Sequence, residues 1–190
     1  KLAALLDEAE ARALEMVKSS SPEMPEEQQK DLAKAIGIGA IKYTDLSQNP
    51  QSLVTFTWEK ALNMEGNSAP YLQYAYARIS SVHDKYQALF PDTDLNTCSI
   101  NIEHDIERRL AIKLSRFPAA IQGAAENYRP NILADYLYEL AQVYSSFYQN
   151  VPFLKAEEGI RESRIRLCRF SARVLKQGLE LLGIQTRERI

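Results

Sequence analysis

Apolar residues recur along most of the chain at the three-to-four-residue spacing of helices that bury one face. Residues 1–18 follow this pattern, and it returns from about Glu26. From Pro70 onward the same spacing predicts one helix after another, and Gly183 stands where a glycine commonly ends a helix. The helices predicted in this second part span residues 70–89, 105–115, 118–127, 133–150 and 161–182.

Two stretches interrupt this pattern. Gly37 and Gly39 lie inside the helical segment DLAKAIGIGAIKYTDL, where each glycine costs about 1 kcal/mol relative to alanine. They indicate either close backbone packing or a break between two helices. The segment LVTFTW, residues 53–58, has the composition of a strand but no second strand to pair with, so we expect it to be extended or irregular. The chain as a whole is predicted to be an all-α helical bundle.

Composition and charge narrow the function classes. The 190 residues are 45% hydrophobic and 25% charged with a net charge of −2, so the overall field does not attract nucleic acid and any such contact needs a local patch. No apolar run approaches the roughly 20 residues of a membrane span. Cys98 and Cys168 show no metal-binding spacing and are expected to be free thiols. We therefore expect a cytoplasmic protein with no membrane partner and no DNA partner.

The chain carries no recognisable catalytic motif. His83 and His104 have no Ser, Cys or Asp partner at a known spacing. The glycine-rich GIGAIK lies within a helical pattern and lacks the strand that a phosphate-binding loop requires. We therefore expect no catalytic residue, no metal site and no bound cofactor in these residues.

The stretch NSAPYLQYAYARISS, residues 67–81, carries more polar aromatic surface than a core-facing helix needs. On a helix, Tyr71, Tyr74 and Arg78 share one face, and this combination suits stacking on bases and contact with phosphate. The same residues would also suit a seam between helices, with the hydroxyls bonded to backbone and the arginine lying over the rings. The residues expected to face the core are Leu72, Tyr76 and Ile79.

A basic stripe runs along the last helix. Residues 155–176 hold seven basic and three acidic side chains, an excess that could neutralise phosphates. It could equally be the solvated face of a long helix. The side chains of this stripe, which we treat as possible phosphate contacts, are Arg166, Arg169, Arg173 and Lys176.

Several blocks together resemble the arginyl-tRNA synthetases. GIGAIKYTDLSQNP resembles the family's G-A-[VI]-K-Y-x-D-L-S, and MEGNSAPYLQYAYARISS resembles its G-N-T-A-x-Y-[LVM]-Q-Y-A-x-[AS]-R. LADYLYELAQVYSSFYQNVPFL and RESRIRLCRFSARVLKQGLELLGIQTRERI resemble the last two long helices of its anticodon-binding domain. The blocks appear in the family's order over nearly the whole chain.

This resemblance implies the C-terminal part of a class I arginine–tRNA ligase, an aminoacyl-tRNA synthetase. Residues 67–190 would form the helical anticodon-binding (DALR) domain, and residues 1–66 the tail of the catalytic region. The nucleotide-binding fold and signatures that bind ATP have no counterpart here, so this part alone should be inactive. The resemblance further implies ATP with Mg²⁺ for the full-length enzyme, a monomeric state, and the anticodon loop of arginine tRNA as partner.

The resemblance also implies site residues. In eukaryotic relatives, tyrosines and an arginine of the Y-[LVM]-Q-Y-A-x-[AS]-R helix face the anticodon loop, and Tyr71, Tyr74 and Arg78 match those positions. Tyr148 matches a pocket tyrosine near the end of the penultimate long helix. The family closes the pocket with the last residue of a P-E-R-M ending. Here the ending is R-E-R-I, so Ile190 takes that place with a different side chain.

Two other interpretations stay open. The tyrosine face could be the hot spot of a helical protein–protein interaction module. Alternatively, the chain could be the anticodon domain of another class I synthetase, such as the cysteinyl or methionyl enzyme, although the Y-L-Q-Y-A-Y-A-R block argues against this.

Overall fold

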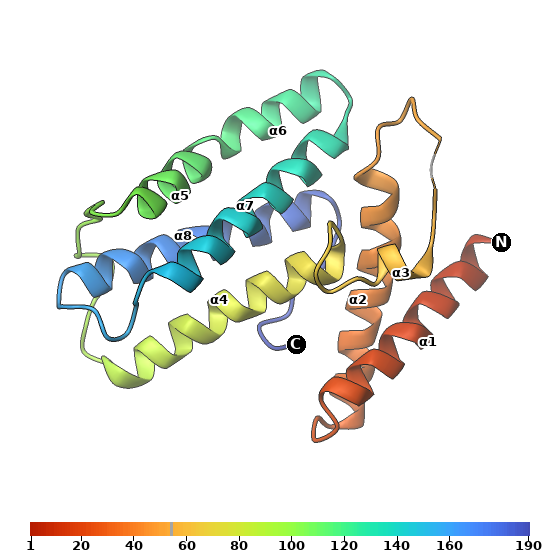
Figure 1. Cartoon of the computed structure of the whole chain (residues 1–190). Coiled ribbons are helices and arrows are strands. Elements are labelled where there is room, and N and C mark those ends of the chain that lie inside the picture. Colours follow the sequence, from red (N-terminus) through yellow and green to blue (C-terminus); the bar gives the residue numbers. More distant parts are fainter. Residues whose placement is uncertain (54) are drawn as a thin grey trace.

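The computed structural model describes residues 1–53 and 55–190, and all of its regular structure is helical within these residues (Figure 1). The predicted all-α class is therefore confirmed. Of the segment predicted to be extended or irregular, residue 54 lies outside the described residues, and residues 53 and 55–57 form neither helix nor strand. The prediction was wrong at Trp58, which begins a short helix capped by the side chain of Thr57. The helices are α1 (Leu2–Ser20), α2 (Glu26–Leu46), α3 (Trp58–Ala61), α4 (Ala69–Leu89), α5 (Asp105–Ser115), α6 (Phe117–Glu126), α7 (Pro130–Asn150) and α8 (Ile160–Leu181).

The first two helices form a close antiparallel hairpin. A Cβ added to Gly37 would lie 2.6 Å from the carbonyl oxygen of Ala9, so α1 and α2 approach backbone to backbone at this point. A Cβ on Gly39 would lie 3.0 Å from Nε2 of Gln73 and 3.2 Å from Ile184. Helix α2 continues through both glycines. Close packing is therefore the correct explanation of the two glycines, and the alternative of a break was wrong.

The remaining helices form the main bundle. Helices α4, α7 and α8 pack against one another, α5 and α6 cover α7, and α2 packs against α4 (Figure 1). The residues of α4 predicted to face the core, Leu72, Tyr76 and Ile79, are all buried.

Cys98 and Cys168 are free thiols, as expected, and Cys168 is buried. Within the described residues, no helix combines the length and apolarity needed to cross a membrane.

Two local features set the position of the site. Ser68 caps α4 by accepting a hydrogen bond from the backbone N–H of Tyr71 at 3.3 Å, and Pro70 lies in the first turn, where its missing N–H costs nothing. At the other end of the chain, Gly183 has a φ of +69°, and the segment after it turns back toward α2 and α4. Ile184 is buried at 1% exposure.

Candidate nucleic-acid interface

A surface cavity of about 450 Å³ lies where α4, the end of α7, the α1–α2 connection and the C-terminal segment meet. We call it the Tyr148 pocket. Its walls combine aromatic, cationic and apolar groups from four segments that are far apart in sequence. The residues that give it this character are Tyr74, Arg78, Lys85, Tyr148, Arg189 and Ile190.

Arg78 joins the two aromatic walls of this pocket. Its guanidinium carbon lies 4.8 Å from the ring centroid of Tyr148 and 5.6 Å from that of Tyr74, which places a cation over two π faces. Among residues 1–53 and 55–190, no carboxylate forms an ion pair with Arg78. Its N–H groups are therefore not committed to a carboxylate. Tyr74 is 39% exposed, so its ring is accessible to a ligand.

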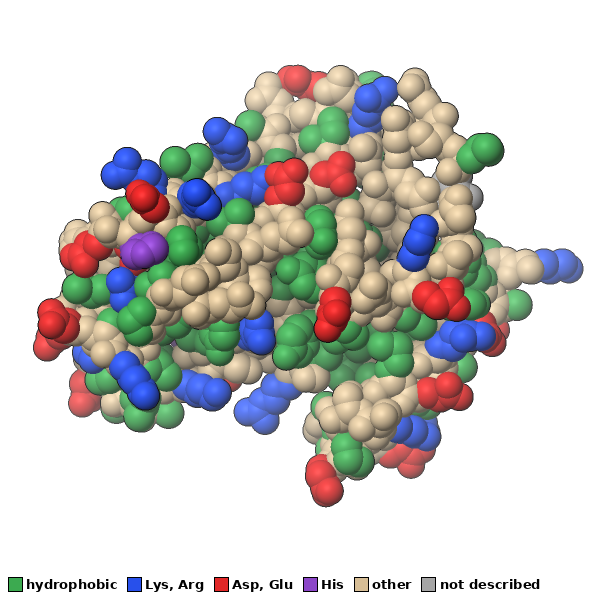
Figure 2. Space-filling view, viewed as in Figure 1, with side chains coloured by type: hydrophobic (Ala, Val, Ile, Leu, Met, Phe, Trp, Pro, Cys, Tyr) green, Lys and Arg blue, Asp and Glu red, His purple; other side chains and the backbone are tan. Residues whose placement is uncertain are grey.

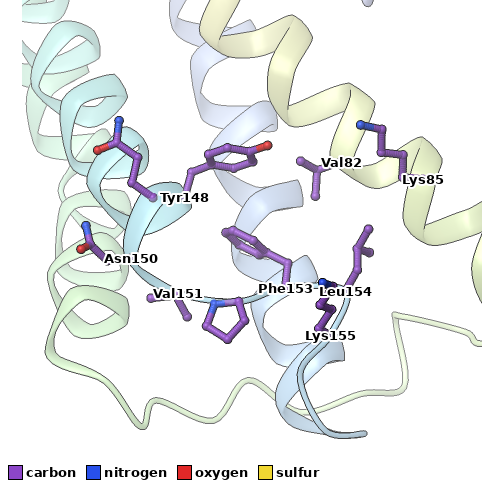
Figure 3. Close-up of a pocket in the computed structure, with 10 residues that line it drawn as sticks. Val82, Lys85, Tyr148, Asn150, Val151, Phe153, Leu154 and Lys155 are labelled. Atoms are coloured by element: carbon purple, nitrogen blue, oxygen red, sulfur yellow. The ribbon is translucent and has the colours of Figure 1, made fainter.

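Two aromatic neighbours hold the ring of Tyr148. Its ring centroid lies 5.6 Å from that of Phe153 and 6.3 Å from that of the buried Tyr144. Such contacts restrict the orientation of the ring. Tyr148 also lines a second cavity of about 530 Å³, which is formed by residues 149–155 and by Val82 and Lys85 of α4 (Figure 3).

Sequence reasoning missed Lys85, which lines both cavities. In Figure 3 this lysine extends from α4, while Tyr148 and Phe153 lie between that helix and the end of α7. A signal was present in the sequence, because Lys85 comes seven residues after Arg78 and therefore lies on the same helix face two turns later. The sequence did not indicate that residues 149–155 line a cavity, because their arrangement depends on the turn that ends α7.

Tyr71 lies apart from this group. It is half-buried, and its ring meets that of Tyr138 on α7 edge to face at 5.6 Å. Burial raises the pKa of its hydroxyl, and the neighbouring Tyr138 raises it further. Tyr71 does not line the Tyr148 pocket. The structure thus brings Tyr74, Arg78, Tyr148 and Ile190 together, and it places Tyr71 in the seam between α4 and α7.

Ile190 forms part of the pocket wall and also packs against the small apolar cluster between α1 and α2. It packs against an apolar cluster of both helices that includes Val17 and Leu32, in company with Met24. The side chain therefore has an apolar backing. One of its sides remains available to the pocket.

The basic stripe of α8 is partly engaged inside the molecule. Arg166 donates to the carbonyl oxygen of Cys98, and Arg169 Nη1 donates to Asn96 Oδ1 at 3.1 Å. Both therefore fasten the loop between α4 and α5, while Arg173 and Lys176 are exposed. None of the four lines either cavity. Phosphate contact and a solvated helix face both stay open as interpretations of the stripe.

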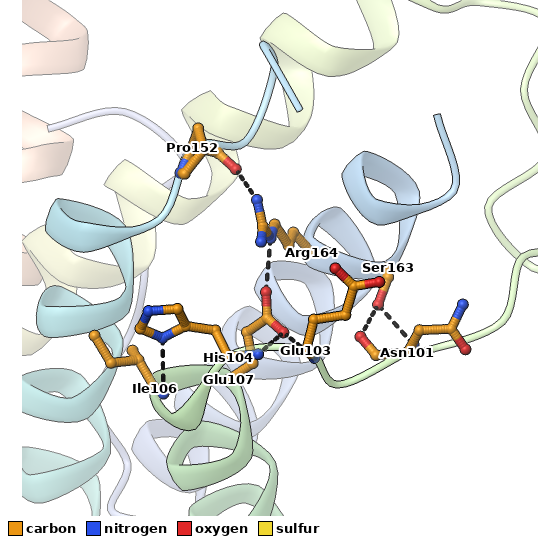
Figure 4. A network of polar contacts seen from close by, with 8 residues as sticks. All are labelled: Asn101, Glu103, His104, Ile106, Glu107, Pro152, Ser163 and Arg164. Atoms are coloured by element: carbon orange, nitrogen blue, oxygen red, sulfur yellow. Dashed lines mark hydrogen bonds and ion pairs between the residues drawn. The ribbon is translucent and has the colours of Figure 1, made fainter. Parts of the chain in front are cut away.

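A buried polar network holds the same loop from its other end (Figure 4). Glu107 is 1% exposed; it accepts from the backbone N–H groups of Glu103 at 2.7 Å and His104 at 3.0 Å, and from Arg164 Nε at 2.6 Å. Burial works against ionisation of this carboxyl, but the three hydrogen bonds prevail and its pKa is lowered. Arg164 Nη1 also donates to the carbonyl oxygen of Pro152 at 2.8 Å.

Both histidines have structural surroundings in this fold. His104 is the N-cap of α5, and its Nδ1 accepts from the backbone N–H of Ile106 at 3.2 Å. His83 is half-buried on α4. Over the described ranges, no group of three or more His, Cys, Asp or Glu residues is arranged to hold a metal ion.

The charged side chains on the face of Figure 2 are mixed in sign, with Lys and Arg interspersed among Asp and Glu. No broad patch of one charge dominates this face. The Tyr148 pocket differs from this mixed surface, because aromatic rings and cations line one cavity there.

Comparison with known proteins identifies the family. The model of the DALR anticodon binding domain matches residues 72–190. The chain belongs to this family. A second model, of the class I (R) tRNA synthetase catalytic domain, matches residues 1–58 ahead of the DALR domain. The boundary at residues 66 and 67 stays a prediction.

Several proteins are similar to the chain over its whole length. Proteins called arginine–tRNA ligase from Mannheimia succiniciproducens and Proteus mirabilis are 45% and 43% identical over the full chain. The structure of Thermus thermophilus arginyl-tRNA synthetase superposes on all of it with a TM-score of 0.91 at 32% identity. That of the Plasmodium falciparum enzyme does so with a TM-score of 0.85 at 26% identity.

The resemblance to arginyl-tRNA synthetases is therefore confirmed. The chain spans about a third of the length of these relatives, 33% for both bacterial ligases and 32% for the Thermus structure. The DALR domain is thus one part of a longer architecture in those proteins.

Proposed function

We propose that this chain recognises the anticodon loop of arginine tRNA as part of an arginine–tRNA ligase. The observation that carries the proposal is the grouping of Tyr74, Arg78 and Tyr148 around one surface-open cavity within a DALR domain. Anticodon bases can be unstacked and received singly by aromatic side chains, and each stacking contact contributes roughly 1–3 kcal/mol.

In this proposal the pocket acts by binding and orientation. A base enters beside the rings of Tyr74 and Tyr148, and Arg78 supplies N–H donors to a phosphate or a base edge. Lys85 adds positive charge at the rim. Tyr71 contributes less to binding than Tyr74 and Tyr148 do, because Tyr138 already covers part of its ring.

The chemistry of the ligase is assigned to the rest of the enzyme. We propose that ATP and Mg²⁺ act in the catalytic domain, of which this chain holds only the segment matched at residues 1–58. Binding at the Tyr148 pocket would then help to orient the tRNA so that its acceptor end reaches the distant reaction centre. The proposed full-length enzyme works as a monomer, and the isolated chain binds RNA without catalysis.

The proposal is tested by titrating the chain with two labelled RNA hairpins at low and moderate salt. One hairpin carries an arginine anticodon loop, and the other is identical except for the central anticodon base. We expect tighter binding of the arginine hairpin, with affinity falling steeply between about 50 and 200 mM salt because phosphate contacts release counterions. Equal affinity for both hairpins would contradict the proposal. Salt-insensitive binding of a protein, with no RNA binding, would favour the interaction-module alternative.

A further inference from the structure

The segment after α8 is fastened to the molecule at three successive points. Lys42 Nζ donates to the carbonyl oxygen of Gly183 at 2.6 Å. Two residues on, Gln73 Nε2 donates to the carbonyl oxygen of Gln185 at 2.7 Å, and also to that of Ala35 on α2 at 3.0 Å. Gln73 is 1% exposed, so the side chain that bridges α4, α2 and the segment is itself buried.

The third point is a bidentate ion pair between the segment and α2. Arg187 Nε lies 2.7 Å from Asp31 Oδ2, and Arg187 Nη2 lies 3.0 Å from Asp31 Oδ1. The same guanidinium donates to Gln185 Oε1 at 3.0 Å and to the carbonyl oxygen of Thr186 at 3.1 Å. Four acceptors thus fix its plane, and two parallel bonds to one carboxylate set direction as well as distance.

This ion pair lies immediately ahead of the pocket wall. Arg189 and Ile190, two and three residues after Arg187, both line the Tyr148 pocket. The hydrogen bond at Gln185 comes two residues before Arg187, so the ion pair is the last fixed point ahead of Arg189 and Ile190. The contact between Ile190 and the apolar cluster of the hairpin is non-directional and does not set the path of the backbone by itself.

We propose that Asp31 and Arg187 are positioning residues, forming an ionic latch that sets Arg189 and Ile190 as the fourth wall of the Tyr148 pocket. The latch sharpens discrimination between anticodon bases, because a wall held in place excludes a base of the wrong shape or hydrogen-bonding pattern. This inference rests on the proposed function, since it concerns the same pocket.

The test uses four variants of the 190-residue chain. Arg187→Asp and Asp31→Arg each break the latch and place like charges together, and the double variant restores an ion pair with its polarity reversed. Lys60→Asp is the control for the charge change in Arg187→Asp, because this exposed lysine of α3 lines neither cavity. For each variant the affinities for the arginine hairpin and for the hairpin with the altered central base give a discrimination ratio.

We expect each single latch variant to lose about three- to tenfold in discrimination, since partly exposed charge pairs are worth roughly 1 kcal/mol. The double variant should recover to within about twofold of the wild type, and Lys60→Asp should leave the ratio unchanged. Melting temperatures should stay close together, because the latch lies outside the main core. No recovery in the double variant, or an equal loss in Lys60→Asp, would overturn the proposal.

A second measurement separates the latch from the proposed function. Backbone ¹⁵N order parameters of residues 186–190 should be lower in Arg187→Asp than in the wild type and should rise again in the double variant, because the order parameter reports how tightly the segment is held. If the wild-type chain does not distinguish the hairpins, the proposed function fails, while the order parameters still report on the latch. Unchanged order parameters in the single variant overturn the latch whatever the hairpins show.

Discussion

Two arginine-bearing surfaces, one on α4 and one on α8, look alike in the sequence and differ in the fold. Arg78 on α4 lies over two tyrosine rings at a cavity and has no carboxylate partner among the described residues. Arg166 and Arg169 on α8 donate to the loop between α4 and α5. A basic residue is therefore available to RNA only if the fold leaves its donors uncommitted. Substitutions in the loop network, in the Tyr148 pocket and along α8 can test this difference.

The largest effect is expected on the structural side, at Glu107. Glu107→Ala removes the acceptor of two backbone N–H groups and of Arg164, so we expect a loss of about 2–3 kcal/mol in the free energy of unfolding. Because its pKa is lowered in the folded state, its stabilisation is present at neutral pH and is lost as pH falls below about 4. Urea unfolding of wild type and variant at pH 7 and pH 3 checks this, and a gap that stays the same at both values contradicts it.

On the binding side the largest loss is expected at Tyr148. Tyr148→Ala removes the ring that faces both cavities, and a tenfold or greater loss of affinity for the arginine hairpin is expected from a stacking contribution of roughly 1–3 kcal/mol. Tyr148→Phe keeps the ring and should retain most of the affinity. Tyr128→Ala is the matched control, because Tyr128 is 90% exposed and lines neither cavity. Equal losses at positions 128 and 148 would remove the distinction between the pocket and ordinary surface.

Arg166→Ala should affect stability more than binding. Its contact with the carbonyl oxygen of Cys98 holds the loop, so we expect a loss of about 1 kcal/mol in the free energy of unfolding. Affinity for the arginine hairpin should change less than twofold. Thermal unfolding and hairpin titration of the same preparation show whether Arg166→Ala changes stability or affinity more. A tenfold loss of affinity with unchanged stability would show that the α8 stripe is the RNA surface.

The smallest effect is expected for the outer half of the stripe. Replacing both Arg173 and Lys176 by alanine removes two exposed cations that line neither cavity. We expect less than a twofold change in affinity and an unchanged dependence on salt. If both residues contact phosphate, the slope of log affinity against log salt should fall by about 2, which the hairpin titration would detect.

The sequence allowed the helices and their buried faces to be predicted because these depend on local periodicity. The spacing of Leu72, Tyr76 and Ile79 identified the core face of α4, and all three are buried. The same spacing could not separate Tyr71 from Tyr74. Their different surroundings depend on Tyr138, which α7 brings against Tyr71 from more than sixty positions away.

The site was predictable in part through its resemblance to a family. Tyr71, Tyr74 and Arg78 were named from their helix face and then matched to the family, whereas Tyr148 and Ile190 were named from the resemblance alone. The fold brings all of them except Tyr71 to one pocket. Asp31 was not found, because its bond to Arg187 joins residues 156 positions apart and Asp31 belongs to no recognisable motif. The hydrogen bond between Arg166 and the loop was not predicted either. The helical pattern indicates which side chains lie at the surface, but it does not indicate what they bind.

The proposed function depends above all on contact between a base of the anticodon loop and the rings of Tyr74 and Tyr148. The most direct measurement is NMR of the tyrosine ring protons while the arginine hairpin is added, with resonances assigned by single Tyr→Phe replacements. A base stacked on a ring shifts its protons through the ring current. We predict that Tyr74 and Tyr148 shift together as binding saturates while Tyr128 stays in place. Saturated binding with unshifted Tyr74 and Tyr148 resonances would contradict the proposed recognition of the anticodon.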